Sequence, residues 1–272
     1  QLGIAAEENF IDYMVVDATF MWGDACRDWF KLKNKMQRLF VTGNPKYDVC
    51  FNWKPLYQRS ELFHNLNLDP KKPTILFTTQ AIVKFSSYRT DDENEVLTKK
   101  LLGFFKTSLQ YQFIIKVHPY EDENVHKRAV KESGLSNVRV VKNMNMFELI
   151  VHSDLLITKN STTGLEAMIF DKPVITIELS KRRDQVPYGE KGAAITIHRA
   201  EEIANAINVC LNDTKTRSDL ETNRRKFIYN YAYKIDGLAS QRVVDKMDEA
   251  LVKGLKNFRD LEEETLIENI IN

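Results

Sequence analysis

The sequence predicts an α/β protein built on a doubly wound parallel sheet, in which helices cover both faces of the strands. The composition, 43% hydrophobic and 28% charged residues over 272 positions, is globular and excludes a disordered or fibrous chain. Short apolar runs alternate with helical patterns along the middle of the chain. These runs are almost continuously apolar, which is typical of parallel strands buried on both faces. The length corresponds to about two domains, or to one large one.

Six apolar runs are the predicted strands. They are rich in β-branched side chains, and turn-forming residues bound several of them. Pro73 precedes the first run, His118 and Pro119 close the second, and Pro173 opens the fifth. In chain order we expect strands over 74–79, 113–117, 138–141, 154–158, 174–177 and 193–197.

Helical patterns fill the intervals between these strands. Apolar residues at helical spacing predict a helix over 93–110, and acidic residues at 121–123 favour the start of the next one. Alternation of strands and helices implies crossover connections and an open sheet. Further helices are expected over 122–133, 146–152, 163–170, 200–211 and from 214 onward, where Val243, Val244, Met247, Leu251 and Leu255 form a face that should pack.

The first 42 residues form a segment of a different kind. Residues 13–16 and 39–42 are typical of strands, and Gly43, Asn44 and Pro45 end the second of them. This segment contains predicted strands but too few residues to form a hydrophobic core of its own. We therefore divide the chain into 1–42, the end of a preceding domain with its linker, and 43–272, one α/β domain with extra C-terminal helices.

Charge and cysteine content exclude several function classes. The 39 basic and 38 acidic residues give a net charge of +1, whereas a dedicated nucleic-acid-binding protein is usually far more basic. Cys26, Cys50 and Cys210 are widely spaced, which is typical of reduced thiols in a cytoplasmic protein and not of a disulfide or zinc framework. No apolar stretch reaches the roughly 18 residues of a membrane-spanning helix. We expect no metal and no nucleic-acid partner.

The turn after the fourth predicted strand is the first candidate site. In open α/β sheets, ligands bind beyond the carboxyl ends of the strands. Ser161, Thr162, Thr163 and Gly164 form a hydroxyl-rich turn that leads directly into a helix, where free N–H groups and the helix dipole favour a phosphate. Glu166 can accept hydrogen bonds from ribose hydroxyls. The alternative is an ordinary Ser/Thr cap with Glu166 as its capping-box partner.

Two other strand ends contribute polar residues to the same predicted edge. His118 follows the second strand, where an imidazole can donate to a phosphate oxygen and offset leaving-group charge. Lys116 either reaches the phosphate or has a structural role. Thr78, Thr79 and Gln80 end the first strand and offer hydroxyl and amide donors. For each of these residues an ordinary polar loop remains the alternative, so the combination carries more weight than any single one.

Four stretches in series resemble one superfamily of enzymes. Residues 41–48, VTGNPKYD, resemble the segment that joins the halves of GT-B-type transferases and of non-hydrolysing UDP-N-acetylglucosamine 2-epimerases. Residues 116–119, KVHP, are similar to the KxHP stretch of capsule, teichoic-acid and sialic-acid transferases. Residues 161–168, followed by 172–175, resemble their donor-phosphate and ribose segment. Residues 236–242, DGLASQR, resemble the DGxAxxR stretch of CDP-glycerol glycerophosphotransferase-like proteins.

This resemblance implies the Rossmann-like C-terminal half of a GT-B transferase. Such an enzyme moves a sugar or polyol phosphate from a CMP-, CDP- or UDP-activated donor to a cell-surface polysaccharide or lipid-linked acceptor, without a cofactor. Ser161, Thr162 and Thr163 would hold the donor phosphates, with Glu166 on the ribose and His118 supporting the leaving group. Gly43, Asn44 and Pro45 would line the cleft between the two halves.

The departures from the family pattern leave alternatives open. The epimerases carry a DSGG-like turn with two glutamates, which residues 159–163 replace here, with Glu166 alone. That argues against an epimerase but keeps it as the second interpretation. Ser161 and Thr162 match the S-S/T motif of bacterial sialyltransferases, which favours a cytidine donor.

The start of the chain bears on the same question. About 40 residues precede Gly43, so we expect most of the acceptor domain, and the general base with it, to be missing from this chain. A non-catalytic nucleotide-binding module is therefore the third interpretation. The basic run Lys181–Arg183 leaves a peripheral contact with an anionic membrane open.

Overall fold

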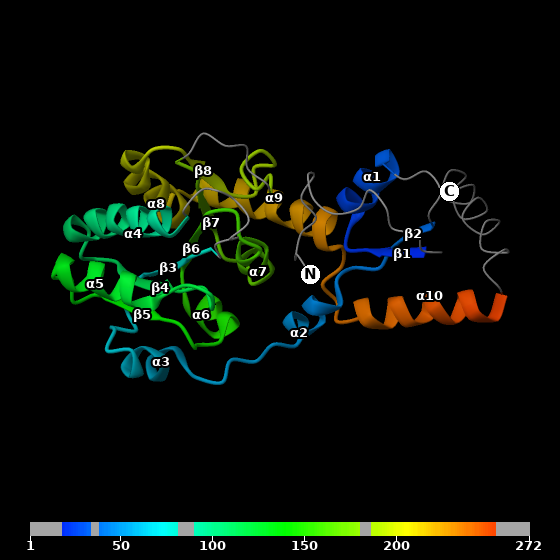
Figure 1. Cartoon of the computed structure of the whole chain (residues 1–272), viewed down its shortest axis with the longest axis horizontal. Coiled ribbons are helices and arrows are strands. Elements are labelled where there is room, and N and C mark those ends of the chain that lie inside the picture. The colour runs from blue at the N-terminus through cyan, green and yellow to red at the C-terminus, as the bar shows by residue number, and fades with distance from the viewer. Residues whose placement is uncertain (1–17, 34–37, 81–89, 180–185, 254–272) are drawn as a thin grey trace. The chain divides into compact units, whose positions relative to one another are not determined.

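The computed structural model describes residues 18–33, 38–80, 90–179 and 186–253 (Figure 1). Their contacts divide the chain into two compact units. Of the described residues, the larger unit holds those within 54–228, and the smaller unit holds those within 18–53 and 229–253. Each unit has its own sheet.

The larger unit is built on a six-stranded parallel sheet. The strand order is β5-β4-β3-β6-β7-β8, so the chain moves outward from β3 to β5 and then returns to place β6 on the other side of β3. The order therefore reverses between β3 and β6. In doubly wound sheets, such a switch point opens a crevice for ligands at the carboxyl ends of the strands. The strands are β3 (Thr74–Thr78), β4 (Gln112–Lys116), β5 (Val138–Val141), β6 (Leu155–Thr158), β7 (Val174–Ile177) and β8 (Ile195–Ile197).

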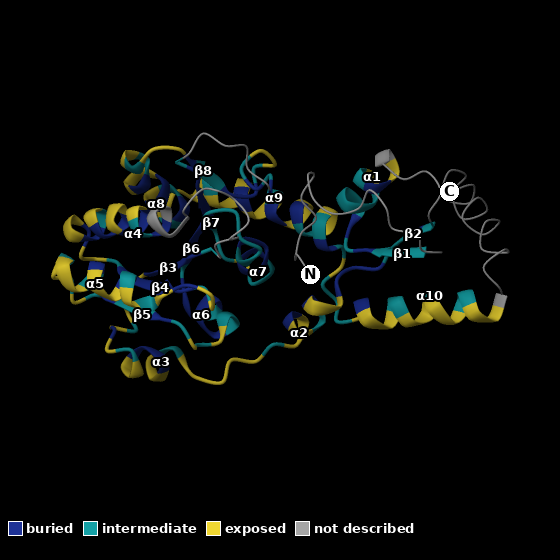
Figure 2. Ribbon diagram, viewed as in Figure 1, coloured by how far each residue is buried: buried dark blue, intermediate teal, exposed yellow. Residues whose placement is uncertain are grey.

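Helices cover both faces of this sheet, which confirms the predicted fold class. The core on one face joins the sheet to α4 (Thr90–Thr107), α5 (Glu123–Ser133) and α8 (Ile203–Asn212). Helices α6 (Met146–His152) and α7 (Thr163–Ile169) contact other parts of β3, β6 and β7. Strands β3, β4, β6 and β7 are buried along their whole length, and Figure 2 shows the outer sides of α4 and α5 as exposed.

Alternation along the strands sends apolar side chains to both faces. Phe77 and Phe113 stack with ring centroids 6.2 Å apart, and Phe105 of α4 stacks on Phe113 at 4.3 Å. Leu76 and Ile114, the register partners that alternate with them, are fully buried toward the opposite face. A continuously apolar strand is therefore the expected sequence for each central position.

Short polar side chains set the boundaries of the helices. Asp122 caps α5 by accepting a hydrogen bond from Asn124 N at 3.0 Å, and Gly134 ends that helix in the left-handed conformation, with φ 71°. Asn145 caps α6 in the same way, accepting from the backbone N–H groups of Phe147 and Glu148. These caps satisfy N–H groups that would otherwise lack an acceptor.

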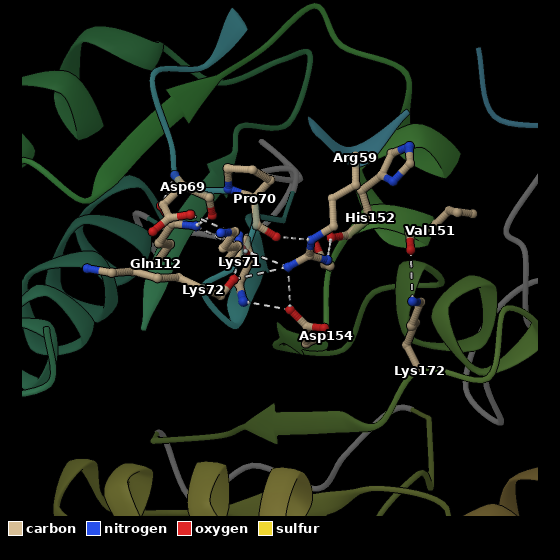
Figure 3. A network of polar contacts seen from close by, with 12 residues as sticks. Arg59, Asp69, Pro70, Lys71, Lys72, Gln112, Val151, His152, Asp154 and Lys172 are labelled. Carbon is tan, nitrogen blue, oxygen red and sulfur yellow. Dashed lines mark hydrogen bonds and ion pairs between the residues drawn. The ribbon is translucent and has the colours of Figure 1, made fainter. Parts of the chain in front are cut away.

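A polar network fixes the edge at which β3 and β6 begin (Figure 3). Arg59, the first residue of α3 (Arg59–Asn65), donates to the Asp154 carboxylate at 2.8 Å and to the carbonyl oxygen of His152. The same carboxylate accepts from Thr74 N at 2.7 Å, at the start of β3. Arg59 therefore ties α3 to two neighbouring strands. This network lies at the opposite end of the strands from the predicted ligand edge.

The smaller unit combines segments that are far apart in the sequence. Strands β1 (Ala18–Met21) and β2 (Arg38–Val41) pair in parallel, and Met21, Phe30 and Leu39 form a small core. The Asp48 carboxylate accepts from Ala239 N and Ser240 N, each at 2.8 Å, at the start of α10. The other helices that contribute to this unit are α1 (Asp24–Lys33), the 3-10 turn η1 (Pro45–Tyr47), α2 (Asp48–Phe51), the end of α9 (Thr214–Ala232) and α10 (Ala239–Lys253).

The last described helix differs in part from the expectations drawn from the sequence. The apolar face of the last helix was expected to pack, but Val244, Met247 and Leu251 of α10 are 48%, 50% and 80% exposed. That expectation was wrong, because helical spacing places residues on one face without supplying a surface to cover them. The predicted strand at 13–16 and Leu255 lie outside the described residues. Contacts group α10 with residues 18–53. The predicted division between residues 42 and 43 was drawn from the sequence pattern of the first 42 residues and not from contacts, and it stays a prediction.

Candidate functional site

The switch point between β3 and β6 brings hydroxyl groups together. Thr78 and Thr158 end the two strands and are register partners. The Thr78 hydroxyl donates to Thr158 Oγ1 at 3.0 Å and lies 2.8 Å from Thr163 Oγ1. Because a hydroxyl has one proton, the Thr163 hydroxyl donates to Thr78 in this arrangement. Thr78 is 1% exposed, so its hydroxyl fixes the start of α7 against the sheet.

The N-terminus of α7 has more internal acceptors than we expected. Thr163 N donates to Ser161 Oγ at 3.3 Å, and Gly164 N donates to Ser161 O at 3.1 Å. Leu165 N donates to the Tyr188 hydroxyl at 3.0 Å. The half-buried hydroxyls of Ser161 and Thr162 therefore remain the main candidates for phosphate contacts at this turn.

The capping alternative for this turn is supported at Ser161, whose hydroxyl accepts from Thr163 N. Thr162 occupies the cap position of α7, but its side chain makes no capping hydrogen bond. Glu166 lies in the first turn of α7 and is 5% exposed. Its assignment to the donor ribose stays a prediction.

Tyr188 supports the same turn, and sequence reasoning missed it. Its hydroxyl donates to Ser161 O at 3.0 Å while accepting from Leu165 N. A Cβ at Gly164 would lie 3.0 Å from Tyr188 Cζ, so the ring packs directly on this glycine. Tyr188 follows Pro187 in a stretch with no periodic pattern, and nothing in that stretch signals a long-range contact.

His118 is held just beyond the end of β4, beside the end of β3. Its backbone N–H donates to Thr79 Oγ1 at 2.8 Å. Its ring Nδ1 accepts from Tyr120 N at 3.2 Å. A neutral imidazole that accepts at Nδ1 carries its proton on Nε2. His118 therefore presents a hydrogen-bond donor at Nε2.

The surroundings of His118 keep its ring neutral. Burial lowers the pKa of His118, and the nearby ammonium groups of Lys116 and Lys142 lower it further, against the opposing effect of Glu121. At neutral pH the side chain is therefore a neutral donor and not a cation. Such a group can stabilise developing negative charge through a directed hydrogen bond.

Glu121 organises the loop that carries His118, and the sequence analysis did not identify it. It is 5% exposed and accepts hydrogen bonds from the Thr79 hydroxyl, the Asn94 amide and His118 N. His126 Nε2 lies 3.9 Å from it. Burial acts to raise the pKa of Glu121, but hydrogen bonds from these partners outweigh it and hold the pKa below its usual value.

Gln80 and Lys116 have partners within the chain as well. Gln80 Oε1 accepts from Asn160 N at 3.3 Å and so links the loops that follow β3 and β6. Lys116 Nζ donates to Lys142 O at 2.5 Å. Burial, together with the charge of Lys142, lowers the pKa of Lys116. These contacts favour the structural alternative for Lys116, and its role toward a phosphate stays a prediction.

The predicted site residues fall into two groups. The strand-end residues Thr78, Thr79, Gln80, Lys116, His118, Ser161, Thr162, Thr163, Gly164 and Glu166 all belong to the larger unit. Gly43, Asn44 and Pro45 belong to the smaller unit, so their place in a cleft stays a prediction. There Gly43 has φ 84° and Asn44 Oδ1 accepts from Lys46 N at 3.0 Å. The basic run Lys181–Arg183 lies outside the described residues.

No group of three or more His, Cys, Asp or Glu side chains in the described part of the chain is arranged to hold a metal ion. None of the described helices is both long and apolar enough to span a bilayer.

Comparison with known families places the chain. A family model described as CDP-Glycerol:Poly(glycerophosphate) glycerophosphotransferase matches residues 4–248. The chain belongs to this family. The match extends over most of both compact units and includes every residue of the predicted site. It confirms the resemblance drawn from the four motifs. A search of curated proteins gave no match.

Solved structures show the same fold at low sequence identity. A putative UDP-N-acetylglucosamine 2-epimerase from Listeria monocytogenes has a TM-score of 0.64 at 15% identity, covering 88% of this chain and 60% of its own. The S. aureus MnaA–UDP structure has a TM-score of 0.64 at 16% identity, and the match covers 87% of this chain and 60% of MnaA. The wall teichoic acid polymerase TagF has a TM-score of 0.56 at 21% identity, and the match covers 89% of this chain and 59% of TagF. The chain thus spans about 60% of the length of these proteins.

Proposed function

We propose that this chain is the donor-binding part of a transferase that moves a polyol phosphate from a CDP-activated donor to a surface polymer. The family match over residues 4–248 carries the proposal. The arrangement at the switch point supports it, because hydroxyl groups and a neutral imidazole meet at the strand edge where nucleotides bind in doubly wound sheets. A sugar in place of the polyol is the second form of the same proposal.

The choice of a cytidine donor rests on the relatives. The family description names CDP-glycerol. A structure of a TagF variant was obtained with CDPG, with a TM-score of 0.58 to this chain. Ser161 and Thr162 are the hydroxyl pair that we assign to the donor phosphates. Glu166, two residues beyond Gly164 in α7, is assigned to the ribose.

In this transfer reaction the donor site has to stabilise the negative charge of a leaving phosphate. An acceptor hydroxyl oxygen attacks the phosphorus that carries the polyol, and the bond from that phosphorus to the bridging oxygen breaks. CMP leaves with the electron pair of that bond, so negative charge grows on its phosphate. The Nε2–H of His118 and the hydroxyls of Ser161 and Thr162 are the donors that we place around this charge. The proton of the acceptor passes to a base, which the family resemblance places in the preceding domain.

A nucleotide-binding panel tests the proposal. A ligand that binds the folded state selectively raises the melting temperature. We expect CDP-glycerol and CMP to stabilise the chain more than UDP, GDP or ADP. His118→Ala should lower the affinity for these nucleotides by about tenfold, because one hydrogen bond to a charged group is lost. The rise in melting temperature should shrink accordingly. His64→Ala, an exposed histidine in α3, is the matched control and should bind like the parent protein.

Two outcomes would redirect the assignment. Preference for UDP, with conversion of UDP-N-acetylglucosamine in the absence of an acceptor, would identify an epimerase. No response to any nucleotide, from a chain that is folded by circular dichroism, would favour a partner-binding module.

A further inference from the structure

A cavity of about 500 Å³ lies beside the start of β7. Asp171 and Pro173, which directly precede this strand, form one wall, and the first half of α9 forms the other. The donor residues proposed above follow the opposite, carboxyl ends of the strands. The cavity is therefore a separate feature of the larger unit, with a volume typical of small-molecule sites.

Arg224 lines this cavity and has few hydrogen-bond acceptors. The residue is 6% exposed, and its Nε is buried with no hydrogen-bond partner among the described residues. Its Nη2 lies 3.5 Å from Asp171 O, at the limit of a hydrogen bond. A buried guanidinium with few acceptors is costly, and an anionic group in the cavity would offset part of that cost through its charge. Burial also lowers the pKa of Arg224, against the effects of Asp171 and Glu221.

A second cation and a hydroxyl face the same space. Arg217 lies seven residues before Arg224 in α9, which places the two on one side of the helix, and Ser218 lines the same cavity. Arg217 is exposed and forms no ion pair within the described part of the chain. A guanidinium pairs well with phosphate oxygens because its N–H groups form a fixed fork. The two arginines and the hydroxyl therefore offer directed donors to one anionic group.

The acidic residues of the lining limit the charge of that group. Glu221 and Asp171 also face the cavity, although Glu221 is held by Arg225 at 2.7 Å. Two cations and two carboxylates leave no net formal charge. The two carboxylates would repel a dianionic phosphomonoester. A monoanionic phosphodiester carries one charge, which hydrogen bonds from the arginine side chains can balance. The carboxylates can in turn accept hydrogen bonds from hydroxyl groups.

We propose that this cavity binds a phosphodiester that carries polyol hydroxyl groups. The phosphate lies between Arg217 and Arg224, the hydroxyls contact Glu221 and Asp171, and the carbon atoms lie near Pro173. Such a unit is the repeat of the poly(glycerophosphate) named in the family description. The cavity would then hold a stretch of polymer away from the donor site, and this binding does not depend on the donor assignment.

Calorimetric titration of the full chain with glycerophosphoglycerol tests the proposal. We expect saturable binding that persists when CMP is present. Arg217→Gln should weaken it by about tenfold, as the loss of a charge-assisted hydrogen bond does. Lys215→Gln removes the same charge from the same helix outside the cavity and should change nothing. Arg224→Lys should weaken binding as well, with its fold checked by circular dichroism.

Several results would overturn the proposal. They are the absence of saturable binding, equal affinities of the Arg217→Gln and Lys215→Gln proteins, and tighter binding of glycerol 3-phosphate than of the diester. Displacement by CMP would place the diester in the donor site instead. Arg217-dependent binding to phosphatidylglycerol vesicles, without binding of the free diester, would assign the cavity to a lipid headgroup.

Discussion

At the scale of single residues, Glu121 controls the position of His118. Its carboxylate accepts from His118 N directly and from the Thr79 hydroxyl, which itself accepts from His118 N. Asn94 extends this network into α4, since its amide donates to the same carboxylate and to Gln80 O. One buried charge therefore fixes the loops after both β3 and β4. We regard Glu121 as a positioning residue, because it acts through His118.

Glu121→Gln tests this position. The amide keeps the shape but replaces one acceptor oxygen with a donor, which then faces the donor groups of Thr79 or Asn94. We expect a loss of about 1–3 kcal/mol in the free energy of unfolding. CDP-glycerol binding should weaken in parallel. Denaturant titration and calorimetry measure the two effects. Glu123→Gln, which removes an exposed pair with Lys127, should cost less than about 0.5 kcal/mol. Equal effects of the two substitutions would contradict the positioning role.

His118 and His152 should make stability depend on pH. Burial lowers the pKa of each below the usual histidine value of about 6.5. Between the folded and unfolded pKa values the unfolded chain binds the proton and the folded chain does not. Stability is therefore fully present above about pH 7 and falls as pH decreases through 6.5.

The variant His152→Gln isolates one of these two histidines. Glutamine can keep the donor that His152 Nε2 provides to Tyr57 O at 2.9 Å, but it does not titrate. The free energy of unfolding should then vary less between about pH 7.5 and pH 5.5. The exposed His64→Gln is the control and should leave the slope unchanged. A slope that is the same in all three proteins would exclude His152 as a source of the dependence.

The residue types of the site were predictable, but their partners were not. Polar residues at strand ends mark a ligand edge in any parallel sheet, and this placed His118 and Ser161 correctly at one end of the strands. Whether a hydroxyl faces a ligand or another hydroxyl depends on contacts across about 80 residues of sequence, as between Thr78 and Thr163. Glu121 was missed for the same reason, because its partners come from α4, α5 and the loop after β3.

At the scale of elements, the start of α7 is the most constrained feature of the site. The Tyr188 ring packs on Gly164 while its hydroxyl bonds on both sides of that glycine, to Ser161 O and from Leu165 N. These bonds hold the ring in place. The turn that carries the proposed phosphate contacts therefore has little room to shift.

Gly164→Ala and Gly103→Ala form a matched pair of helical substitutions. A Cβ at Gly164 would meet three Tyr188 atoms at 3.0–3.2 Å, so we expect a loss of about 1–3 kcal/mol and weaker nucleotide binding. A Cβ at Gly103 in α4 meets nothing within 4 Å, so that substitution should stabilise by up to about 1 kcal/mol. Thermal unfolding measures both. Similar changes in melting temperature for the two variants would show that the Tyr188 ring moves away from a Cβ at position 164 at little cost.

The elements themselves were largely predictable because their patterns are local. Strands at 138–141 and 174–177 agree with β5 and β7, and helix 146–152 agrees with α6. The last strand was expected from Ala193 but begins at Ile195. Ala193 N and Ala194 N donate instead to Tyr188 O, at 2.9 and 3.2 Å, which keeps both residues out of the sheet. Apolar β-strand character alone does not reveal such a competing acceptor.

At the scale of the whole molecule, the smaller unit depends on bonds between distant segments. Arg242 donates to Thr42 O at 2.7 Å and to both oxygens of the Asp236 carboxylate, at 2.9 and 2.8 Å. Asp48 caps α10 from a position about 190 residues earlier in the chain. Local patterns do not encode such pairings, because the bonded residues lie about 190–200 positions apart in the sequence. The DGLASQR stretch that revealed the family also holds this unit together.

Asp48→Ala tests whether the two units respond separately to a lost contact. Burial acts to raise the pKa of Asp48, but hydrogen bonds from Ser240 and Ala239 outweigh it, so the carboxylate is charged when it caps α10. Loss of a helix cap costs about 1–2 kcal/mol. We therefore expect faster amide hydrogen exchange over 38–51 and 239–253, with no change in β3, β4 and β6.

The control for this experiment is Asp245→Ala, which removes only an exposed bond from Gln241 within α10. It should leave exchange unchanged in both units. Faster exchange throughout the Asp48→Ala protein would mean that the units unfold as one, since a local opening affects only the residues of its own cooperative unit. Faster exchange confined to the smaller unit would mean that its long-range contacts can open while the sheet that carries His118 and Ser161 stays folded.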